Sequence, residues 1–319
     1  MDTQLDFTFQ PDASEVNMIV GWRQWADAGS VSSGLPQYLV AQTKARKIGQ
    51  MSSDGFYIFQ VPGTHDLMRP MVKFKEGYPV YLESQENLFY YTGDAQRGVV
   101  IFLGDEPQLD IERYSRTLLS AAQTLRVKRI VGVGGVYGEV PYDKERIITT
   151  HYSRHALKAE LENLALSLSG YQGGASIDSV VCRRAGDRDM EYVGMYALVP
   201  FYDFSENSQP EHMIRLENDY KAWLGVMRRI NFMLKTGFDL LDLEKKSRRQ
   251  LKVIEGKIDE LETANPSLNV REYIQHLSEN FTEVPFSPLD DVWEKNLGQL
   301  LDTLDDSSDP GDPGDIPDE

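Results

Sequence analysis

The feature that most constrains the fold is one strand–helix–strand unit between residues 97 and 136. Two almost continuously apolar runs, "RGVVIFLG" (97–104) and "KRIVGVGGV" (128–136), flank the segment 111–127. Strands that are apolar throughout are buried on both faces, which is typical of parallel strands in a sheet covered by helices. The middle segment carries apolar residues three and four apart, as one face of a helix requires: Ile111, Tyr114, Leu118, Ala121, Ala122 and Leu125.

Strand-like and helix-like runs alternate through the first two thirds of the chain. Apolar or aromatic runs predict strands at 17–22, 55–59, 80–84, 88–93, 146–150 and 192–200, with another within 170–181. Helices are predicted at 30–45 and 154–168, and a longer one at 210–235. The sequence therefore predicts an α/β body with a mostly parallel or mixed sheet that ends near residue 205.

The C-terminal part has a different pattern. Its apolar residues Leu251, Ile254, Ile258 and Leu261 are three, four and three apart, which indicates a helical hairpin or a short coiled coil that Pro266 ends. Shorter helices are predicted near 269–280 and 288–304. The last residues are rich in Asp, Pro, Gly and Ser and are predicted to be disordered. We therefore predict three parts: an α/β domain (1–235), a helical extension (236–304) and an acidic tail (305–319).

The charge balance limits the classes of partner. The chain of 319 residues has a formal net charge of -17, and residues 302–319 hold eight acidic residues and no Lys or Arg. An acidic surface repels nucleic acid and anionic membranes, so neither is expected as a partner. Cys182 is the single cysteine. No internal disulfide can form, no signal peptide or membrane span is recognisable, and a soluble cytoplasmic protein is predicted.

The first candidate site is the loop "VGWRQWADAGSVSSG" (20–34), which follows a predicted strand and leads into a predicted helix. Loops after strand ends are where α/β proteins place ligands, and free amides at a helix start bind anions. Trp22, Asp27 and Gly29 are therefore candidate ligand-binding residues. The alternative, which residue types favour, is that Asp27 or Ser30 caps the helix while the Trp rings pack.

The second candidate is the turn "GVGGVYGEVPYDKER" with Gly134 and Gly135. It matches neither the dinucleotide fingerprint nor a P-loop, because no helix-opening Gly-x-Gly-x-x-Gly and no Lys-Ser/Thr pair occurs. The glycines fit a close backbone approach at the exit of a buried strand. An anion-binding turn remains the alternative. Glu106, which also follows a predicted strand, is a candidate base or cap.

Residue types that carry catalysis or bind metals form no convincing group. His151 and His155 are four apart, but no Glu completes a zinc motif and no third ligand is evident. Cys182 lies beside two arginines, yet a buried, inert thiol fits it better. No Gly-x-Ser-x-Gly elbow is present. We expect no cofactor, no bound metal and no catalytic residue.

Several motifs together resemble the proteasome assembly chaperone family, in the group named after its second member. Its Gly-Trp-x-Asp-Ala-Gly segment is similar to Gly21-Trp22 followed by Asp27-Ala28-Gly29, and its Gly-x-Glu-Pro is similar to Gly104–Pro107. The resemblance covers roughly residues 15–235. The other matching motifs are Arg69-Pro70, Val133-Gly134-Gly135, Val140-Pro141, "GYQGGAS" and "VPFYDF".

The resemblance implies a three-layer αβα fold with a mixed sheet, similar to nucleoside phosphorylases, with a C-terminal helical extension. It also adds Arg69 to the candidate ligand-binding residues. Two positions depart from the family: Tyr142-Asp143-Lys144 replaces a His-Thr-Arg segment, and the last residues lack the hydrophobic-Tyr-x tail with which some proteasome chaperones dock. Neither chemistry by that histidine nor that docking mode is expected here.

Two functions follow as hypotheses. The first is a non-catalytic protein-binding or assembly-chaperone-like protein that forms a homo-oligomer and has unidentified protein partners. The alternative is an enzyme or sensor for a nucleoside or phosphorylated ligand, with its pocket between Asp27–Gly29, Glu106 and Gly134-Gly135. An enzyme of that class needs a convergent acid–base pair beside an anion site. Asp27 and Glu106 supply acids, but no base is evident, so the first hypothesis is favoured.

Overall fold

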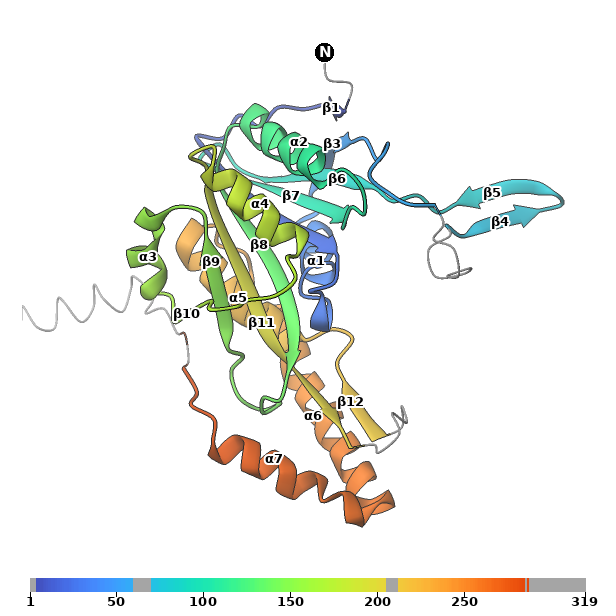
Figure 1. Cartoon of the computed structure of the whole chain (residues 1–319), viewed down its shortest axis with the longest axis vertical. Coiled ribbons are helices and arrows are strands. Elements are labelled where there is room, and N and C mark those ends of the chain that lie inside the picture. The colour runs from blue at the N-terminus through green and yellow to red at the C-terminus, as the bar shows by residue number, and fades with distance from the viewer. Residues whose placement is uncertain (1–3, 60–69, 205–211, 285, 287–319) are drawn as a thin grey trace, which may run out of the picture. The chain divides into compact units, whose positions relative to one another are not determined.

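The computed structural model describes residues 4–59, 70–204, 212–284 and 286. The predicted acidic tail (305–319), the predicted helix at 288–304 and the candidate residue Arg69 lie outside these residues. Figure 1 shows the described part of the chain with its helices and strands labelled.

One large mixed sheet forms the centre of the fold. Its strands are ordered β1-β3-β6-β7-β2-β8-β11-β9-β10, and β12 pairs with β11. In sequence order their bounds are β1 (Leu5–Phe7), β2 (Glu15–Arg23), β3 (Arg46–Met51), β6 (Asn87–Gly93), β7 (Arg97–Asp105), β8 (Val127–Gly138), β9 (Ile148–Tyr152), β10 (Ser167–Leu168), β11 (Glu191–Asp203) and β12 (Met213–Arg215).

The four central strands β7, β2, β8 and β11 are parallel to one another. The outer strands β6, β3 and β9 run antiparallel to their inner neighbours, which makes the sheet mixed. The predicted strand–helix–strand unit corresponds to β7, α2 (Ile111–Thr124) and β8. Because the carboxyl ends of parallel strands share one edge, this arrangement gathers the loops that follow β2, β7 and β8.

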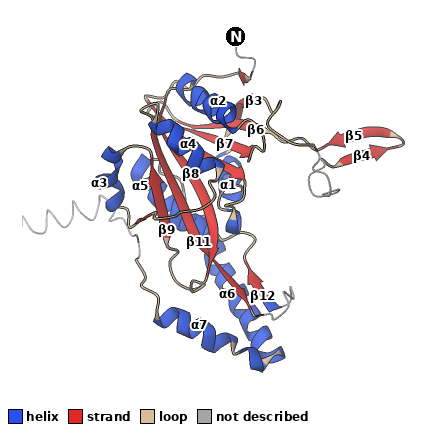
Figure 2. Ribbon diagram, in the orientation of Figure 1, coloured by secondary structure: helices blue, strands red, loops and turns tan. Residues whose placement is uncertain are grey.

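Helices cover both faces of the sheet, which gives the three layers expected (Figure 1, Figure 2). On one face α2 and α4 (Ile177–Gly186) share a hydrophobic cluster with the strands. On the other face a second cluster joins the strands to five helices: α1 (Gly34–Thr43), α3 (Lys158–Glu162), α5 (Tyr220–Leu234), α6 (Leu241–Ala264) and α7 (Val270–Glu279). The described residues also include single-turn 3-10 helices: η1 (Ala28–Ser30), η2 (His155–Leu157) and η4 (Pro266–Leu268).

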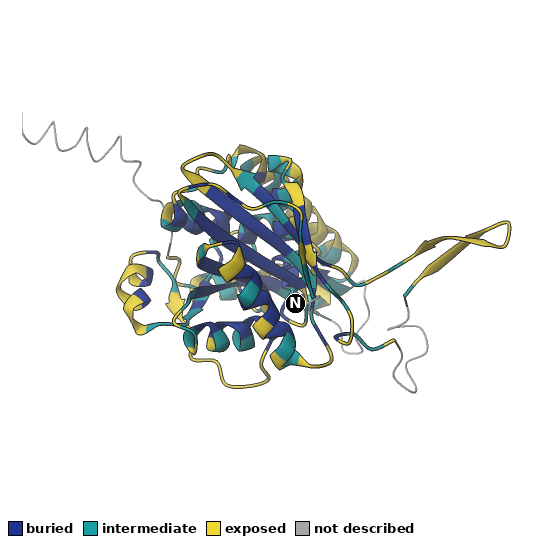
Figure 3. Ribbon diagram, turned by 90° about the horizontal axis from the view of Figure 1, so that it is seen from above, coloured by how far each residue is buried: buried dark blue, intermediate teal, exposed yellow. Residues whose placement is uncertain are grey.

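The central strands are apolar at almost every position because helices cover both faces of the sheet. Successive residues of a strand point to opposite faces, so Ile19 belongs to one cluster while Met18 and Val20 belong to the other. Ile101 and Phe102 are divided in the same way. Figure 3 shows the central strands buried along most of their length. The apolar pattern therefore reports burial on both faces.

Two predicted strands are wrong. Residues 53–59 form turns and bends, because the buried Phe56 anchors this loop and its carbonyl accepts the amides of Gln108 and Leu109. The second half of the segment 170–181 begins helix α4, with Ser176 as its N-cap accepting a hydrogen bond from the amide of Ser179. Cys182 therefore lies on a helix, and not after a strand as predicted.

Two predicted helices start later than expected, each after an aspartate that binds backbone amides. The helix expected at 30–45 begins at Gly34, after a turn in which the carboxylate of Asp27 binds the amides of Ser32 and Ser33. The helix expected at 210–235 begins at Tyr220, where Asp219 is the N-cap. The helix expected at 154–168 is shorter, since helical turns end at Glu162.

The described C-terminal helices contact the α/β body. The chain from Met1 to Phe286 forms one compact unit, and Ile254, Ile258 and Val270 share the hydrophobic cluster of α5. The division between body and helical extension at residue 235 stays a proposal. Among the described helices, none is both long enough and apolar enough to cross a bilayer.

Candidate functional site

The candidate residues meet at the carboxyl-terminal edge of the parallel strands. β2 ends at Arg23 beside Asp105, the last residue of β7. Asp27 forms an isolated parallel bridge with Gly135 of β8, and the amide of Gly135 donates to the carbonyl of Ala26 at 3.0 Å. The residues after β2 and β7 therefore share one sheet edge with Gly134-Gly135 of β8.

Asp27 organises the loop between β2 and α1. Its Oδ1 accepts the amides of Ser32 and Ser33 at 2.8 and 2.9 Å, and its Oδ2 accepts the Ser33 hydroxyl at 2.6 Å. Burial raises the pKa of Asp27 above its usual range, while the hydrogen bonds from Ser33 oppose that shift. Both carboxylate oxygens are therefore engaged in holding the turn that leads into α1.

Glu106 joins two elements that are distant in sequence. Its Oε2 accepts the amide of Trp25 at 2.9 Å, and its Oε1 accepts the amide of Ile177 at 2.9 Å. Ile177 is the first residue of α4, where a carboxylate also interacts favourably with the helix dipole. Glu106 therefore acts as a cap, one of the two roles considered for it, and fixes the backbone at Trp25.

The glycines at the edge permit close backbone contact. A Cβ on Gly135 would lie 2.1 Å from the carbonyl oxygen of Ala28, and a Cβ on Gly134 would lie 2.6 Å from the Tyr196 ring. Gly29 has a φ of +59°, and its carbonyl accepts the amide of Asp219 and the indole of Trp223 at 2.9 Å each. These contacts support the interpretation of the glycine turn as a strand exit.

The two tryptophans of the first loop have opposite environments. Trp22 is 0% exposed, and its indole Nε1 donates to the Tyr114 hydroxyl at 3.0 Å on the α2 face. The structure therefore places Trp22 in the core, away from the surface of the edge. Trp25 is 71% exposed although its backbone is held by Glu106. The sequence offered no signal for this difference, since both residues lie in the same short loop.

Two open cavities lie along this edge, with volumes of about 760 and 540 Å³, and together we call them the edge groove. Both are lined by Gln24 and Asp27. The larger also contacts Trp25, Ala28, Ser30, Tyr137, Arg215, Glu217 and Asn218, and the smaller contacts Arg23, Ser33, Glu106, Pro107 and Gln108. Of the predicted ligand-binding residues, Asp27 and Glu106 therefore line the groove, while Trp22, Gly29, Gly134 and Gly135 are buried beneath it.

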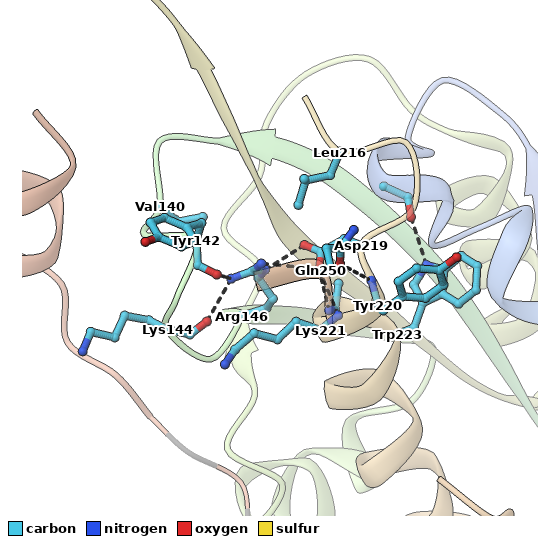
Figure 4. A network of polar contacts seen from close by, with 12 residues as sticks. Val140, Tyr142, Lys144, Arg146, Leu216, Asp219, Tyr220, Lys221, Trp223 and Gln250 are labelled. Carbon is cyan, nitrogen blue, oxygen red and sulfur yellow. Dashed lines mark hydrogen bonds and ion pairs between the residues drawn. The ribbon is translucent and has the colours of Figure 1, made fainter. Parts of the chain in front are cut away.

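A buried ion pair supports the loop from below (Figure 4). The side chains of Arg146 and Asp219 are 1% and 0% exposed, and Arg146 Nε lies 2.7 Å from Asp219 Oδ2. Arg146 Nη1 also donates to the carbonyls of Pro141, Tyr142 and Lys144. Asp219 Oδ1 caps α5, and the Asp219 amide binds Gly29. The pair thus links the segment after β8 to the loop after β2.

A second buried polar group surrounds Asp178 at the start of α4. The Tyr192 hydroxyl donates to Asp178, and His151 Nε2 lies 2.9 Å from Asp178 Oδ2. Burial, with the nearby carboxylate as a smaller cause, raises the pKa of Tyr192 and of Cys182 above their usual ranges. These groups belong to the packing between α4 and the sheet, and the Cys182 thiol is held in its unreactive form.

The histidine pair of the sequence does not converge. His151 lies in β9, whereas His155 begins the following 3-10 helix. Within the described ranges, no group of three or more His, Cys, Asp and Glu side chains is arranged to hold a metal ion. The edge groove therefore combines carboxylates engaged by backbone amides with an exposed indole and the side chains of Arg23 and Arg215.

Comparisons with known proteins extend these observations. The fold is similar to crystal structures of a proteasome-assembly chaperone homologue from Mycobacterium tuberculosis and a PAC2 family protein from Streptomyces avermitilis. Both have a TM-score of 0.64 and 20% sequence identity. The first match covers 76% of this chain and 94% of that chain, and the second covers 81% and 99%.

An archaeal proteasome activator from Pyrococcus furiosus has a TM-score of 0.56 and 16% identity, covering 79% of this chain and 97% of that one. A search of the curated proteins found no match. The family model described as the PAC2 family matches residues 21–258. The resemblance seen in the sequence motifs is thereby confirmed, and the chain belongs to the PAC2 family.

Proposed function

We propose that this protein is a non-catalytic, protein-binding protein of the assembly-chaperone type, which acts in the cytoplasm as a homo-oligomer. The surface that we assign to partner binding is the edge groove, with the exposed Trp25 on the wall of its larger cavity. Proteins of the same fold include a proteasome-assembly chaperone homologue and an archaeal proteasome activator, which supports a role in binding other proteins.

The observation that supports this proposal most is the way in which the loop presents Trp25. Glu106 binds the Trp25 amide, Gly135 binds the Ala26 carbonyl, and Asp27 holds the start of α1. An exposed indole on a fixed backbone has a large contact area that loses little conformational entropy on binding, and tryptophan is enriched among the residues that dominate interface energies. The groove is therefore organised to bind a surface.

The hydrogen bonds of the Asp27 and Glu106 carboxylates also favour a non-catalytic role. General acid–base catalysis needs a carboxyl group within hydrogen-bonding reach of the substrate. Both oxygens of Asp27 and both oxygens of Glu106 already accept hydrogen bonds from this chain. Using either one as a base would release a helix start or the Trp25 loop, which favours a structural role for both acids.

One observation favours the second candidate function, a small-molecule sensor. The side-chain oxygen of Gln24 is buried without a hydrogen-bond partner within the described part of the chain, and Gln24 lines both cavities of the edge groove. A buried amide oxygen is usually satisfied, so a ligand with a hydrogen-bond donor is the alternative occupant of this position.

We expect no hydrolysis or phosphorolysis of nucleosides by the purified protein. The reason is that phosphorolysis needs an anion site and a positioned proton donor, whereas the amides and acids at this edge are paired with each other. The measurement is a turnover assay with a nucleoside panel in the presence of phosphate. Turnover that Asp27→Asn or Glu106→Gln abolishes, in variants that keep the wild-type Tm, would overturn the non-catalytic proposal.

A further inference from the structure

A two-stranded ribbon, which we call the arm, is separate from the main sheet. Its strands β4 (Val72–Lys75) and β5 (Tyr78–Leu82) pair with each other and form a sheet of their own. Every residue of both strands is exposed, as Figure 3 shows by its colour. Isolated two-stranded ribbons are marginally stable in water. The arm therefore has the structure of an element that is covered in its working state.

The two faces of the arm differ in chemistry. Cross-strand partners lie on the same face, and the register pairs Val72 with Leu82, Lys73 with Tyr81, Phe74 with Pro79 and Lys75 with Tyr78. One face therefore carries Val72, Phe74, Pro79 and Leu82, which we call the apolar face. The opposite face carries the two lysines and the two tyrosines. Alternation of this kind is typical of a sheet that is covered on one side.

The exposure of the apolar face is unusual for a surface. Phe74 is 59% exposed and Leu82 is 63% exposed, and Val80, the extra residue at the register shift, is also exposed. Contiguous apolar patches of this kind mark interaction sites. Burial of the side chains on this face would also stabilise the arm itself, because the apolar side chains would leave water.

We infer that the apolar face of the arm packs against the same face of a second copy of this chain. This inference rests on the proposed homo-oligomer. The apolar face carries no charge, so it is complementary to itself, as a two-fold symmetric contact requires. Two such faces bury at most about 800 Å² in total, which is the size of a weak interface.

The charge distribution also favours a second copy of this chain as the partner of the arm. The chain has a net charge of -17, so most surfaces of two copies repel each other. Residues 70–82 hold two lysines and one glutamate, a net charge of +1. Contact through the arms therefore joins two copies through a segment that carries little of the negative charge of the chain, and it leaves Lys73 and Lys75 on the outer faces of the paired ribbons.

The test is sedimentation velocity of the full chain from about 1 to 100 µM, the range expected for an interface of this size. We expect the wild type to dimerise or to assemble further through dimers. The double variant Phe74→Glu/Leu82→Glu should raise the dissociation constant at least about tenfold. The matched control Tyr78→Glu/Tyr81→Glu adds the same charge to the opposite face and should stay within about threefold of the wild type, since that face is not covered.

A mixing experiment makes the test specific for self-association. Equal amounts of Phe74→Glu/Leu82→Glu and Phe74→Lys/Leu82→Lys should assemble together although neither assembles alone, because opposite charges then face each other. A monomeric wild type at all concentrations would overturn both the proposed homo-oligomer and this inference. A different result would overturn only the role of the apolar face. In that result the wild type is oligomeric, and Phe74→Glu/Leu82→Glu and Tyr78→Glu/Tyr81→Glu either raise the dissociation constant equally or both leave it unchanged.

Discussion

Replacing Asp219 by alanine is expected to lower the free energy of unfolding by about 3–5 kcal/mol. The guanidinium of Arg146, whose side chain is 1% exposed, would remain charged inside the protein without its carboxylate. The same substitution removes the cap of α5, since Asp219 Oδ1 accepts the amides of Lys221 and Ala222. The measurement is urea unfolding followed by tryptophan fluorescence and circular dichroism.

The matched control is Asp242→Ala on α6. Asp242 also forms an ion pair, with Lys246 at 2.6 Å, but its side chain is 53% exposed. Exposed pairs contribute about 1 kcal/mol or less because water screens both charges, so this variant should remain close to the wild type. Equal losses for the two variants would show that burial of the Arg146–Asp219 pair is not what stabilises the loop.

The second large effect is expected for Gly135→Ala, which should lower the free energy of unfolding by about 2–3 kcal/mol. The new Cβ would lie 2.1 Å from the Ala28 carbonyl oxygen, so the loop after β2 and the end of β8 must move apart. That movement also lengthens the hydrogen bond from the Gly135 amide to Ala26. The measurement is again urea unfolding.

Gly256→Ala is the control for this substitution. Gly256 lies in α6 with no atom within 4 Å of its added Cβ, so alanine should stabilise the protein by about 0.5–1 kcal/mol through its higher helix propensity. If Gly135→Ala unfolded at the wild-type urea concentration, the close approach of the two segments would be wrong, and the anion-binding interpretation of the turn would regain support.

The general fold could be predicted because its signal is local. The apolar runs at 97–104 and 128–136 correspond to β7 and β8, and the periodic helix between them corresponds to α2. The convergence of Asp27 and Glu106 beside Gly135 at one edge follows from the parallel direction of the strands, whatever their order in the sheet. The fold class and the sheet edge that carries the candidate residues could therefore be predicted without knowing which distant parts of the chain are in contact.

The details of the site depend on contacts between distant parts of the chain. Arg146 is the last residue of the glycine-containing turn segment, but Asp219 is 73 positions away and lies outside every motif noted in the sequence. The opposite environments of Trp22 and Trp25 depend on which residues pack against α2, which a short loop sequence does not show. The sequence predicted one strand of the arm, at 80–84. It did not predict that this strand is separate from the main sheet, because a strand rich in aromatic residues has the same sequence pattern in either position.

The most direct test of the proposed binding function is quantitative mass spectrometry of proteins that co-purify with the tagged chain from its native host. Three forms are compared: the wild type, Trp25→Ala, and Leu241→Ala as a control with a similarly exposed apolar side chain on α6. We expect a stoichiometric protein partner with the wild type and the control, and at least about a tenfold loss with Trp25→Ala, as for a central interface tryptophan. The same partners in the same amounts with all three forms would contradict the assignment of the edge groove as the binding surface.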